Sequence, residues 1–390
     1  MRGETVRNID DWHGQDEAPG RRSQARGVRL SLFTWERVLG ALVVLGLLPA
    51  LLVESIAGSR DHDATAARSL DGHSGLVETL RFSSDGKILL TSGWDRTVRV
   101  WDVEGGSEEE FGREAACLRT TAEVYDAAIS PNGETVAVAG LDGLTIWNWT
   151  DAEELPARIE GMKSCRSLAF SNDGRTLAVG GFDHRIRLLD LGTGQVEATF
   201  QGHIDVVRKI AFTADSQRLI SLSFDGRIKA WDLATGREAP SFADINDVAD
   251  PILTFALAPA GDVLAISRYD SASRGIELWD AAGGGRKIVF ANGDRETHAL
   301  AFSQDGGMLA STGSDLRIRF WNLTTGKSAG TLHGEMGWVR TLDFSADGRW
   351  VAVSSVPDQI LLRRIGLPSL ASHPARTPSL PETPRPSDEA

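Results

Sequence analysis

The residue types that could carry out catalysis are a histidine, a hydroxyl side chain and an aspartate, which occur together twice in the chain. His73 is followed by Thr91 and Asp95, and a second set repeats this spacing; its members are His203, Ser221 and Asp225. A histidine between a hydroxyl and a carboxylate is the arrangement that activates the nucleophile of serine hydrolases. Because a hydrolase needs one such set, repetition along the chain favours a structural role, and we expect no enzyme activity.

Other kinds of site have less support. His184, His298 and His333 lack the close spacing of paired metal ligands, and there is no glycine-rich phosphate loop, so we expect neither a metal nor a cofactor. The formal net charge of −13 argues against nucleic acid as a partner, because binding its backbone needs a basic face. Cys117 and Cys165 are too few for a disulfide framework; Cys165 is expected to be a small buried side chain, and a bond between the two remains open.

The body of the chain consists of seven copies of one pattern. Each copy begins with an apolar residue, continues with a small residue such as serine, and then has a turn rich in aspartate and glycine. The leading apolar residues, 41 to 47 positions apart, are Phe82, Ile129, Phe170, Phe212, Leu257, Phe302 and Phe344. The Asp-Gly or Asn-Gly turn predicts a tight two-residue hairpin, and the apolar runs on both sides predict short strands. Four strands per copy, with no helical period in the body, predict an all-β fold.

The third predicted strand of most copies ends in a tryptophan followed by an aspartate or asparagine. These pairs are Trp101-Asp102, Trp147-Asn148, Trp231-Asp232, Trp279-Asp280 and Trp321-Asn322. With the period of about 44 residues, they resemble the WD-repeat family over residues 66–365.

The resemblance implies a seven-bladed β-propeller, and a hydrogen-bonded structural tetrad in two of its blades. The first tetrad would consist of His73, Thr91, Asp95 and Trp101, and the second of His203, Ser221, Asp225 and Trp231. The other five copies lack the Gly-His pair of the tetrad, so we expect those blades to be looser.

The two ends of the repeat region predict how the ring closes. The seventh copy stops after its third strand, near residues 359–365, and residues 67–70 precede the first copy as an isolated short strand. If that strand becomes the outer strand of the seventh blade, no sheet edge is left exposed there. Residues 366–390 contain six of the 14 prolines, and they predict a Pro-rich disordered tail.

The N-terminal region contains the uncharged run VLGALVVLGLLPALLV within residues 38–57. Its length is marginal for crossing a bilayer, and we interpret it as one transmembrane helix. The Arg-rich leader, residues 1–37, would then be cytoplasmic, with residues 58–65 as a tether and the propeller outside the inner membrane. Two alternatives remain. One is a signal peptide cleaved near Ala57, which would give a secreted or periplasmic protein, and the other is a buried soluble helix.

Candidate partner-binding residues lie where the resemblance places the loops of the top face of the propeller. Five of them precede the turn between the second and third strands, and three stand just before a first strand. They are Trp94, Leu141, Phe182, Phe224 and Tyr269, and Leu76, Val206 and Trp338. Apolar and aromatic side chains on an exposed rim are typical of protein-binding hot spots. The alternatives are that they pack between blades or line a small-molecule pocket.

Together these features predict a membrane-anchored, non-catalytic scaffold that binds a protein or peptide through its top face. An extracytoplasmic propeller hydrolase or lyase is one alternative, and a scaffold facing the cytosol is another.

Overall fold

The computed structural model describes eleven separate ranges of residues between positions 67 and 365. These are residues 67–104, 111–150, 153–155, 162–239, 242–246, 250–269, 275–281, 285–291, 296–333, 339–356 and 358–365. Within these ranges no helix is long and apolar enough to cross a membrane. The leader 1–37, the anchor 38–57, the tether 58–65 and the tail 366–390 lie outside the described residues.

The described strands form seven four-stranded antiparallel sheets, six of them formed by consecutive strands. The first sheet contains β2 (Val77–Phe82), β3 (Ile88–Gly93), β4 (Thr97–Asp102) and β5 (Arg113–Arg119). The second contains β6 (Val124–Ile129), β7 (Thr135–Gly140), β8 (Gly143–Asn148) and β9 (Glu153–Leu155). The third contains β10 (Cys165–Phe170), β11 (Thr176–Gly181), β12 (Arg185–Asp190) and β13 (Gln195–Gln201). The fourth sheet contains β14 (Val207–Phe212), β15 (Arg218–Ser223), β16 (Ile228–Asp232) and β17 (Arg237–Ala239). The fifth contains β18 (Ile252–Leu257), β19 (Val263–Arg268), β20 (Gly275–Asp280) and β21 (Arg286–Ala291). The sixth contains β22 (Thr297–Phe302), β23 (Met308–Gly313), β24 (Arg317–Asn322) and β25 (Lys327–His333).

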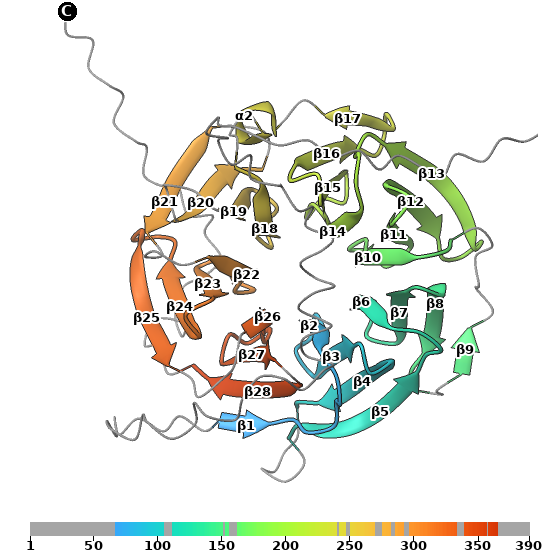
Figure 1. Cartoon of the computed structure of the whole chain (residues 1–390), viewed down its shortest axis with the longest axis horizontal. Coiled ribbons are helices and arrows are strands. Elements are labelled where there is room, and N and C mark those ends of the chain that lie inside the picture. Colours follow the sequence, from blue (N-terminus) through green and yellow to red (C-terminus); the bar gives the residue numbers. More distant parts are fainter. Residues whose placement is uncertain are drawn as a thin grey trace, which may run out of the picture. The chain divides into compact units, whose positions relative to one another are not determined.

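The seventh sheet has the order β1-β28-β27-β26 and closes the ring. It combines β26 (Val339–Phe344), β27 (Trp350–Ser355) and β28 (Gln359–Arg364) with β1 (Ala67–Ser69). Strand β1 pairs antiparallel with β28, and Figure 1 shows it lying along the outer edge of that sheet. The backbone N–H of Leu70 continues the pairing with the carbonyl of Ile360, at 2.9 Å. The predicted closure of the ring by residues 67–70 is therefore confirmed.

The sheets are arranged around a common centre as the blades of a propeller, with strands β2, β6, β10, β14, β18, β22 and β26 innermost (Figure 1). Seven hydrophobic clusters lie between the sheets, one for each neighbouring pair. The cluster between the first and seventh sheets, for example, packs Leu70 and Val77 against Ile360 and Leu362. The core therefore lies between blades, and each sheet depends on its two neighbours to bury both faces.

The turn between the first and second strands differs from the predicted two-residue hairpin. In the first sheet, Ser83 N–H donates to the carbonyl of Ile88 at 2.8 Å, so four residues lie between the paired positions. The Ser83 hydroxyl donates to Asp85 at 2.6 Å and accepts from the N–H of Ile88, and Gly86 follows with φ of 73°. These side-chain bonds replace backbone pairs inside the loop, which is why the repeated serine and aspartate favour this longer turn.

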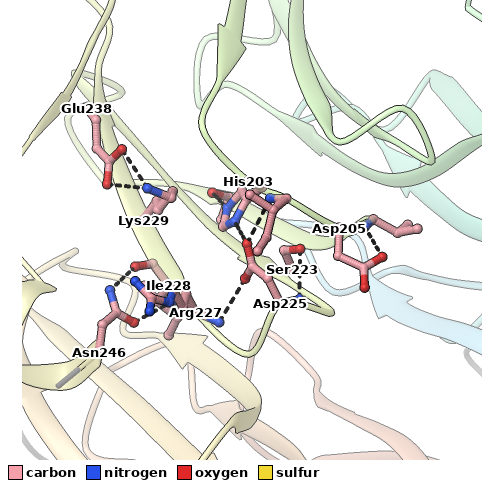
Figure 2. Close-up of polar contacts among 12 residues, drawn as sticks. His203, Asp205, Ser223, Asp225, Arg227, Ile228, Lys229, Glu238 and Asn246 are labelled. Atoms are coloured by element: carbon pink, nitrogen blue, oxygen red, sulfur yellow. Dashed lines mark hydrogen bonds and ion pairs between the residues drawn. The ribbon is translucent and has the colours of Figure 1, made fainter. Parts of the chain in front are cut away.

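In the fourth blade the outer strand is short, and a short helix follows it in the chain. Helix α2 (Ala243–Asn246) follows the three-residue strand β17. Its Asn246 side chain accepts from the N–H of Ile228 and donates to the carbonyl of Ile228, at 3.1 and 2.7 Å (Figure 2). Phe242 and Ile245 are buried in the cluster between the fourth and fifth sheets. The side-chain amide thus takes the place of a neighbouring strand for Ile228, an arrangement that the repeat pattern did not predict.

Candidate functional site

The first set of His, Thr and Asp residues forms one chain of hydrogen bonds with a tryptophan. His73 Nδ1 lies 2.8 Å from Asp95 Oδ2, and its Nε2 lies 2.9 Å from the Thr91 hydroxyl, which also accepts from the indole N–H of Trp101 at 2.8 Å. Although burial by itself raises the pKa of Asp95, the hydrogen bond from His73 and its charge lower that pKa to about 2. Thr91 is 0% exposed. No substrate can reach a hydroxyl in that position, so the set stabilises the blade.

The second set has the same geometry in the fourth sheet, where His203 and Asp225 point toward one another (Figure 2). The distances from His203 to Asp225 Oδ2 and to the Ser221 hydroxyl are both 2.8 Å, and Trp231 donates to that hydroxyl at 2.8 Å. Asp225 also accepts from the backbone N–H groups of Ile204 and Arg227. The aspartate therefore joins the start of the first strand to the turn between the second and third strands.

The fifth sheet replaces the histidine tetrad with a buried ion pair. Arg268 Nε donates to Glu277 at 2.9 Å, and Trp279 donates to the other carboxylate oxygen at 2.8 Å. The two charged side chains are 3% and 5% exposed. Arg268 also donates to the carbonyls of Asp250 and Ile245, which fixes the connection that enters this sheet. The ion pair thus provides a hydrogen-bond partner for the tryptophan and for the preceding connection in a blade that lacks the Gly-His pair.

The remaining copies use less of the tetrad. In the sixth sheet Trp321 donates to Ser311 at 2.9 Å. In the second sheet the indole N–H of Trp147 is buried with no hydrogen-bond partner among the described residues. The expectation that the five blades without the Gly-His pair are looser stays a prediction.

One end of the ring, which we call the top face, carries the turns between second and third strands together with the residues that precede the first strands. The same backbone hydrogen bond joins these two segments in five sheets. The pairs are Trp94 N–H to Leu76 carbonyl, Phe182 to Ser164, Phe224 to Val206, Tyr269 to Pro251 and Ser314 to Glu296, at 2.9 to 3.2 Å. Because this bond recurs, Trp94, Phe182, Phe224 and Tyr269 occupy the same position in their blades.

The exposure of the rim residues differs from one to the next. Leu141 is 47% exposed. Five other rim residues are partly buried: Leu76, Trp94, Phe182, Phe224 and Tyr269. Val206 was predicted to border the rim, but it is buried, at 4% exposed. It directly precedes strand β14, and its carbonyl accepts from the N–H of Phe224. Trp338 lies outside the described residues. Two apolar residues that the prediction missed, Ile204 and Leu316, are 81% and 37% exposed on the same face.

Arginines of the innermost strands hold several of the rim aromatics. The ring of Phe182 packs against Tyr125 with centroids 5.4 Å apart, and the guanidinium of Arg166 lies over Tyr125 at 5.1 Å. Arg208 lies over Phe224 at 5.2 Å and donates to the carbonyls of the next blade. Such cation–π contacts fix the rings while leaving part of each exposed.

A cluster of charged side chains on the innermost strands was missed at the sequence level. We call it the axial cluster; its members are Glu78, Arg81, Asp126, Arg166, Arg208, Lys209, Arg340 and Asp343. Interactions in it join sheets that are not neighbours. Arg81 of the first sheet donates to the carbonyl of Leu168 in the third at 3.3 Å, and Lys209 of the fourth interacts electrostatically with Asp343 of the seventh. The signal was available, because aligning the first strands of the seven copies places these charges at the same few positions.

Four members of the axial cluster occupy the second position of their strand, nearest the top face, and we call them the upper layer. They are Glu78, Arg166, Arg208 and Arg340. Glu78 Oε1 lies 2.6 Å from Arg340, and Oε2 lies 3.6 Å from Arg166. Burial raises the pKa of Glu78, but the charges of Arg340 and Arg166 outweigh it, and the net shift is downward.

The other four members form the lower layer, at the third and fifth positions of their strands. Arg81 pairs with Asp126 at 3.0 Å. Burial, together with the charges of Arg81 and Arg208, lowers the pKa of Lys209 to about 8. Burial raises the pKa of Asp343 to about 6, even though it accepts from the N–H groups of Phe82 and Phe344. The lower layer is balanced, with two cations and two carboxylates.

Comparison with known proteins identifies the repeat. The family model "WD domain, G-beta repeat" matches residues 65–102, 292–322 and 326–360. The model "Anaphase-promoting complex subunit 4 WD40 domain" matches residues 127–215. The chain is a WD-repeat β-propeller.

Its curated relatives include proteins of several kinds. The periodic tryptophan protein 2 homolog of Schizosaccharomyces pombe is 31% identical over 157 residues, covering 34% of this chain and 17% of that protein. Pre-mRNA-processing factor 19 of Oryza sativa is 23% identical over 306 residues, covering 74% of this chain and 47% of that protein. The small ribosomal subunit protein RACK1y of Oryza sativa is 30% identical over 126 residues, covering 30% and 36%. The chain thus spans less than half the length of each of these relatives.

WD-repeat propellers are typically non-catalytic scaffolds that bind proteins, so the prediction that this chain is not an enzyme agrees with its family. The described residues contain no group of three or more His, Cys, Asp or Glu side chains that could hold a metal ion. Cys117 and Cys165 are both free thiols, on the outer strand of the first sheet and the inner strand of the third. Burial raises the pKa of the Cys165 thiol to about 12, in keeping with a packing role.

Four basic residues of the third strands form ion pairs within their own sheets. Arg187 pairs with Asp183 at 2.5 Å and Lys229 with Glu238 at 2.7 Å, and Arg99 and Arg319 pair with Glu114 and Asp315. These four basic residues of the WD-repeat propeller are therefore paired with carboxylates of their own sheets.

Proposed function

We propose that this WD-repeat propeller is a scaffold that binds a protein or peptide through its top face. The observation that carries the proposal is where exposed large apolar side chains gather. Leu141, Ile204 and Leu316 lie in the loops of that face, at 47%, 81% and 37% exposed. Exposed apolar residues beside fixed aromatic rings are the composition of protein-binding hot spots.

The closed ring supports this role through rigidity. Each blade is packed on both sides by a hydrophobic cluster, and the rim aromatics are fixed by cation–π contacts or ring packing. A partner that docks there does not have to order the loops, so less of the contact energy is lost on binding.

The rim is tested by replacing Trp94, Phe182 and Phe224 together with serine. Crosslinking the full-length protein in its native membrane, followed by mass spectrometry, identifies the partner, and pull-down then measures its binding. We expect the triple variant to lose the partner while keeping its unfolding transition. A matched control replaces Val196 and Val289, which are 40% and 44% exposed on fourth strands, with serine. Equal capture by the triple variant would refute the top-face assignment.

We further propose that residues 38–57 anchor the protein in the inner membrane and that the propeller lies outside the cytoplasm. The support is the uncharged apolar run and the excess of arginines before it. A compartment-sensitive reporter fused to the C-terminus tests the orientation, since a signal from the cytosol would reverse it. Sequencing the N-terminus of the mature protein separates an anchor from a signal peptide cleaved near Ala57.

A further inference from the structure

We propose that the partner of the top face presents an acidic polypeptide segment, and that its carboxylates bind the arginines of the upper layer of the axial cluster. The inference rests on the proposed function and adds the chemistry of the partner. Arg166 and Arg340 are the main contacts, with Arg208 beside them.

The first argument is the distribution of charge. The whole chain has a net charge of −13, yet the seven innermost strands, which are completely described, carry five cations and three carboxylates. The lower layer is balanced, so the excess lies in the upper layer, where three arginines face one glutamate. A local excess of positive charge at the centre of a ring attracts anionic groups, since the surrounding protein focuses the field.

The second argument is the sharing of one carboxylate by two arginines. Glu78 interacts with both Arg340 and Arg166, at 2.6 and 3.6 Å, and its own side chain is 5% exposed. Arg340 is still 32% exposed and Arg166 is 12% exposed. The guanidinium of Arg340 therefore stays partly accessible to solvent while it pairs with Glu78. The planar guanidinium has donors enough for two carboxylates.

The third argument is the apolar surroundings of the upper layer. The rings of Tyr125 and Phe224 lie against Arg166 and Arg208, and Phe182 packs on Tyr125. Apolar walls lower the local dielectric constant and strengthen a charge-assisted hydrogen bond. A segment that alternates acidic and apolar residues therefore fits both the arginines and the exposed Ile204 and Leu141.

Four acidic residues of the rim oppose such a partner less, because the protein pairs their carboxylates internally. Asp95 and Asp225 are bound by His73 and His203. Asp183 and Asp315 are paired with arginines of their own sheets. The high negative charge of the whole chain still disfavours a long polyanion such as nucleic acid, which leaves a short acidic segment of a protein.

The experiment measures fluorescence anisotropy of labelled peptides with the purified full-length protein in detergent. The probe is a ten-residue peptide of alternating Glu and Leu, and the matched peptide has Gln in place of Glu. We expect the Glu peptide to bind at least about tenfold more tightly than the Gln peptide, because a hydrogen bond to a carboxylate is roughly twice as strong as one to a neutral amide. The affinity of the Glu peptide should fall as salt increases, because salt screens exposed ionic contacts.

Variants locate the contact. Arg340→Gln is expected to weaken the Glu peptide about tenfold and to leave the Gln peptide unchanged, and Arg340→Lys should give an intermediate value because it keeps the charge without the fork. Lys87→Gln is the control: this exposed cation pairs with Glu104 in the turn opposite the top face. Circular dichroism melting checks that each variant is folded, and Arg340→Lys keeps the test decisive if Arg340→Gln does not fold.

Three outcomes would overturn the inference. They are equal binding of the Glu and Gln peptides, insensitivity of the Glu peptide to both Arg340 variants, and much tighter binding of a phosphoserine version of the peptide, which would assign the arginines to phosphate. The proposed function is judged separately. If the crosslinked partner is lost from the Trp94, Phe182 and Phe224 triple variant but binds normally to Arg340→Gln, the scaffold role stands and the acidic segment does not.

Discussion

His203 and Asp225 are 22 positions apart in the chain, and His203 Nδ1 lies 2.8 Å from Asp225 Oδ2. This contact ties the entry of the first strand to the turn that follows the second. Through Ser221, the same histidine is connected to the indole of Trp231. The pair is structural, and its removal should weaken the fourth blade as a unit.

Ser221→Ala is expected to destabilise the protein by about 1–3 kcal/mol, because it removes the partner of two buried groups, His203 Nε2 and the Trp231 indole N–H. Ser311→Ala is the matched variant, since Ser311 accepts from the Trp321 indole in a blade without the histidine. We expect the cost of Ser311→Ala to be smaller. Urea unfolding of the two variants measures the difference, and equal midpoints would show that the histidine bond contributes nothing.

Arg268→Met should be more severe, at about 3–5 kcal/mol, because Glu277 would be left charged and buried. Adding Glu277→Gln to this variant removes the isolated charge and keeps an acceptor for Trp279, so stability should partly recover. Lys229→Met in the more exposed pair with Glu238 is the control and should cost less than about 1 kcal/mol. Thermal unfolding compares the three proteins. A double variant no more stable than Arg268→Met would contradict the buried-charge explanation.

Leu70→Ala tests the closure of the ring. Leu70 is 2% exposed and packs with Val77, Ile360 and Leu362 between the first and last blades. Truncation of a buried leucine costs about 2–5 kcal/mol. Ile204→Ala removes a similar volume from a side chain that is 81% exposed, so its effect should stay below about 0.5 kcal/mol. Equal melting temperatures for the two variants would mean that the closing strand adds no stability.

His298 should make the fold sensitive to mild acid. Burial, together with the charge of Arg340, lowers the pKa of His298 to about 4, while in the unfolded chain it is about 6.5. Between these values the unfolded chain binds the proton and the folded chain does not, so stability falls as the pH drops from 6.5 to 4. The full loss amounts to about 3 kcal/mol.

The check is the difference in unfolding free energy between His298→Gln and the parent protein across pH 7 to 4. The Glu296 carboxylate, 3.8 Å from His298, also faces the ring and limits the effect. Asp343 acts in the opposite direction, because its raised pKa of about 6 favours the folded state as the pH falls through that value. Taking the difference between the two proteins cancels the contribution of Asp343. A difference that does not change with pH would refute the role of His298.

Much of the fold could be predicted from the sequence because its signals are local and repeat in register. The serine, aspartate and glycine of most first turns act on the few residues around them. The tryptophan near the end of most third strands marks the same strand in copy after copy. Even the closure by residues 67–70 could be predicted, because the last copy lacks exactly one strand and a sheet edge must be paired.

The pairing of charges within the axial cluster, the burial of Val206 and the ion pair between Arg268 and Glu277 were decided only by the tertiary structure. Arg81 bonds to the carbonyl of Leu168, 87 residues away, because the ring brings the first strands of separate blades around one centre. A repeat pattern describes each blade by itself, whereas these charges meet across the ring, where burial and the neighbouring blades set their pairing. The sequence therefore determined the blades and their number, and the closing of the ring determined which side chains share its centre.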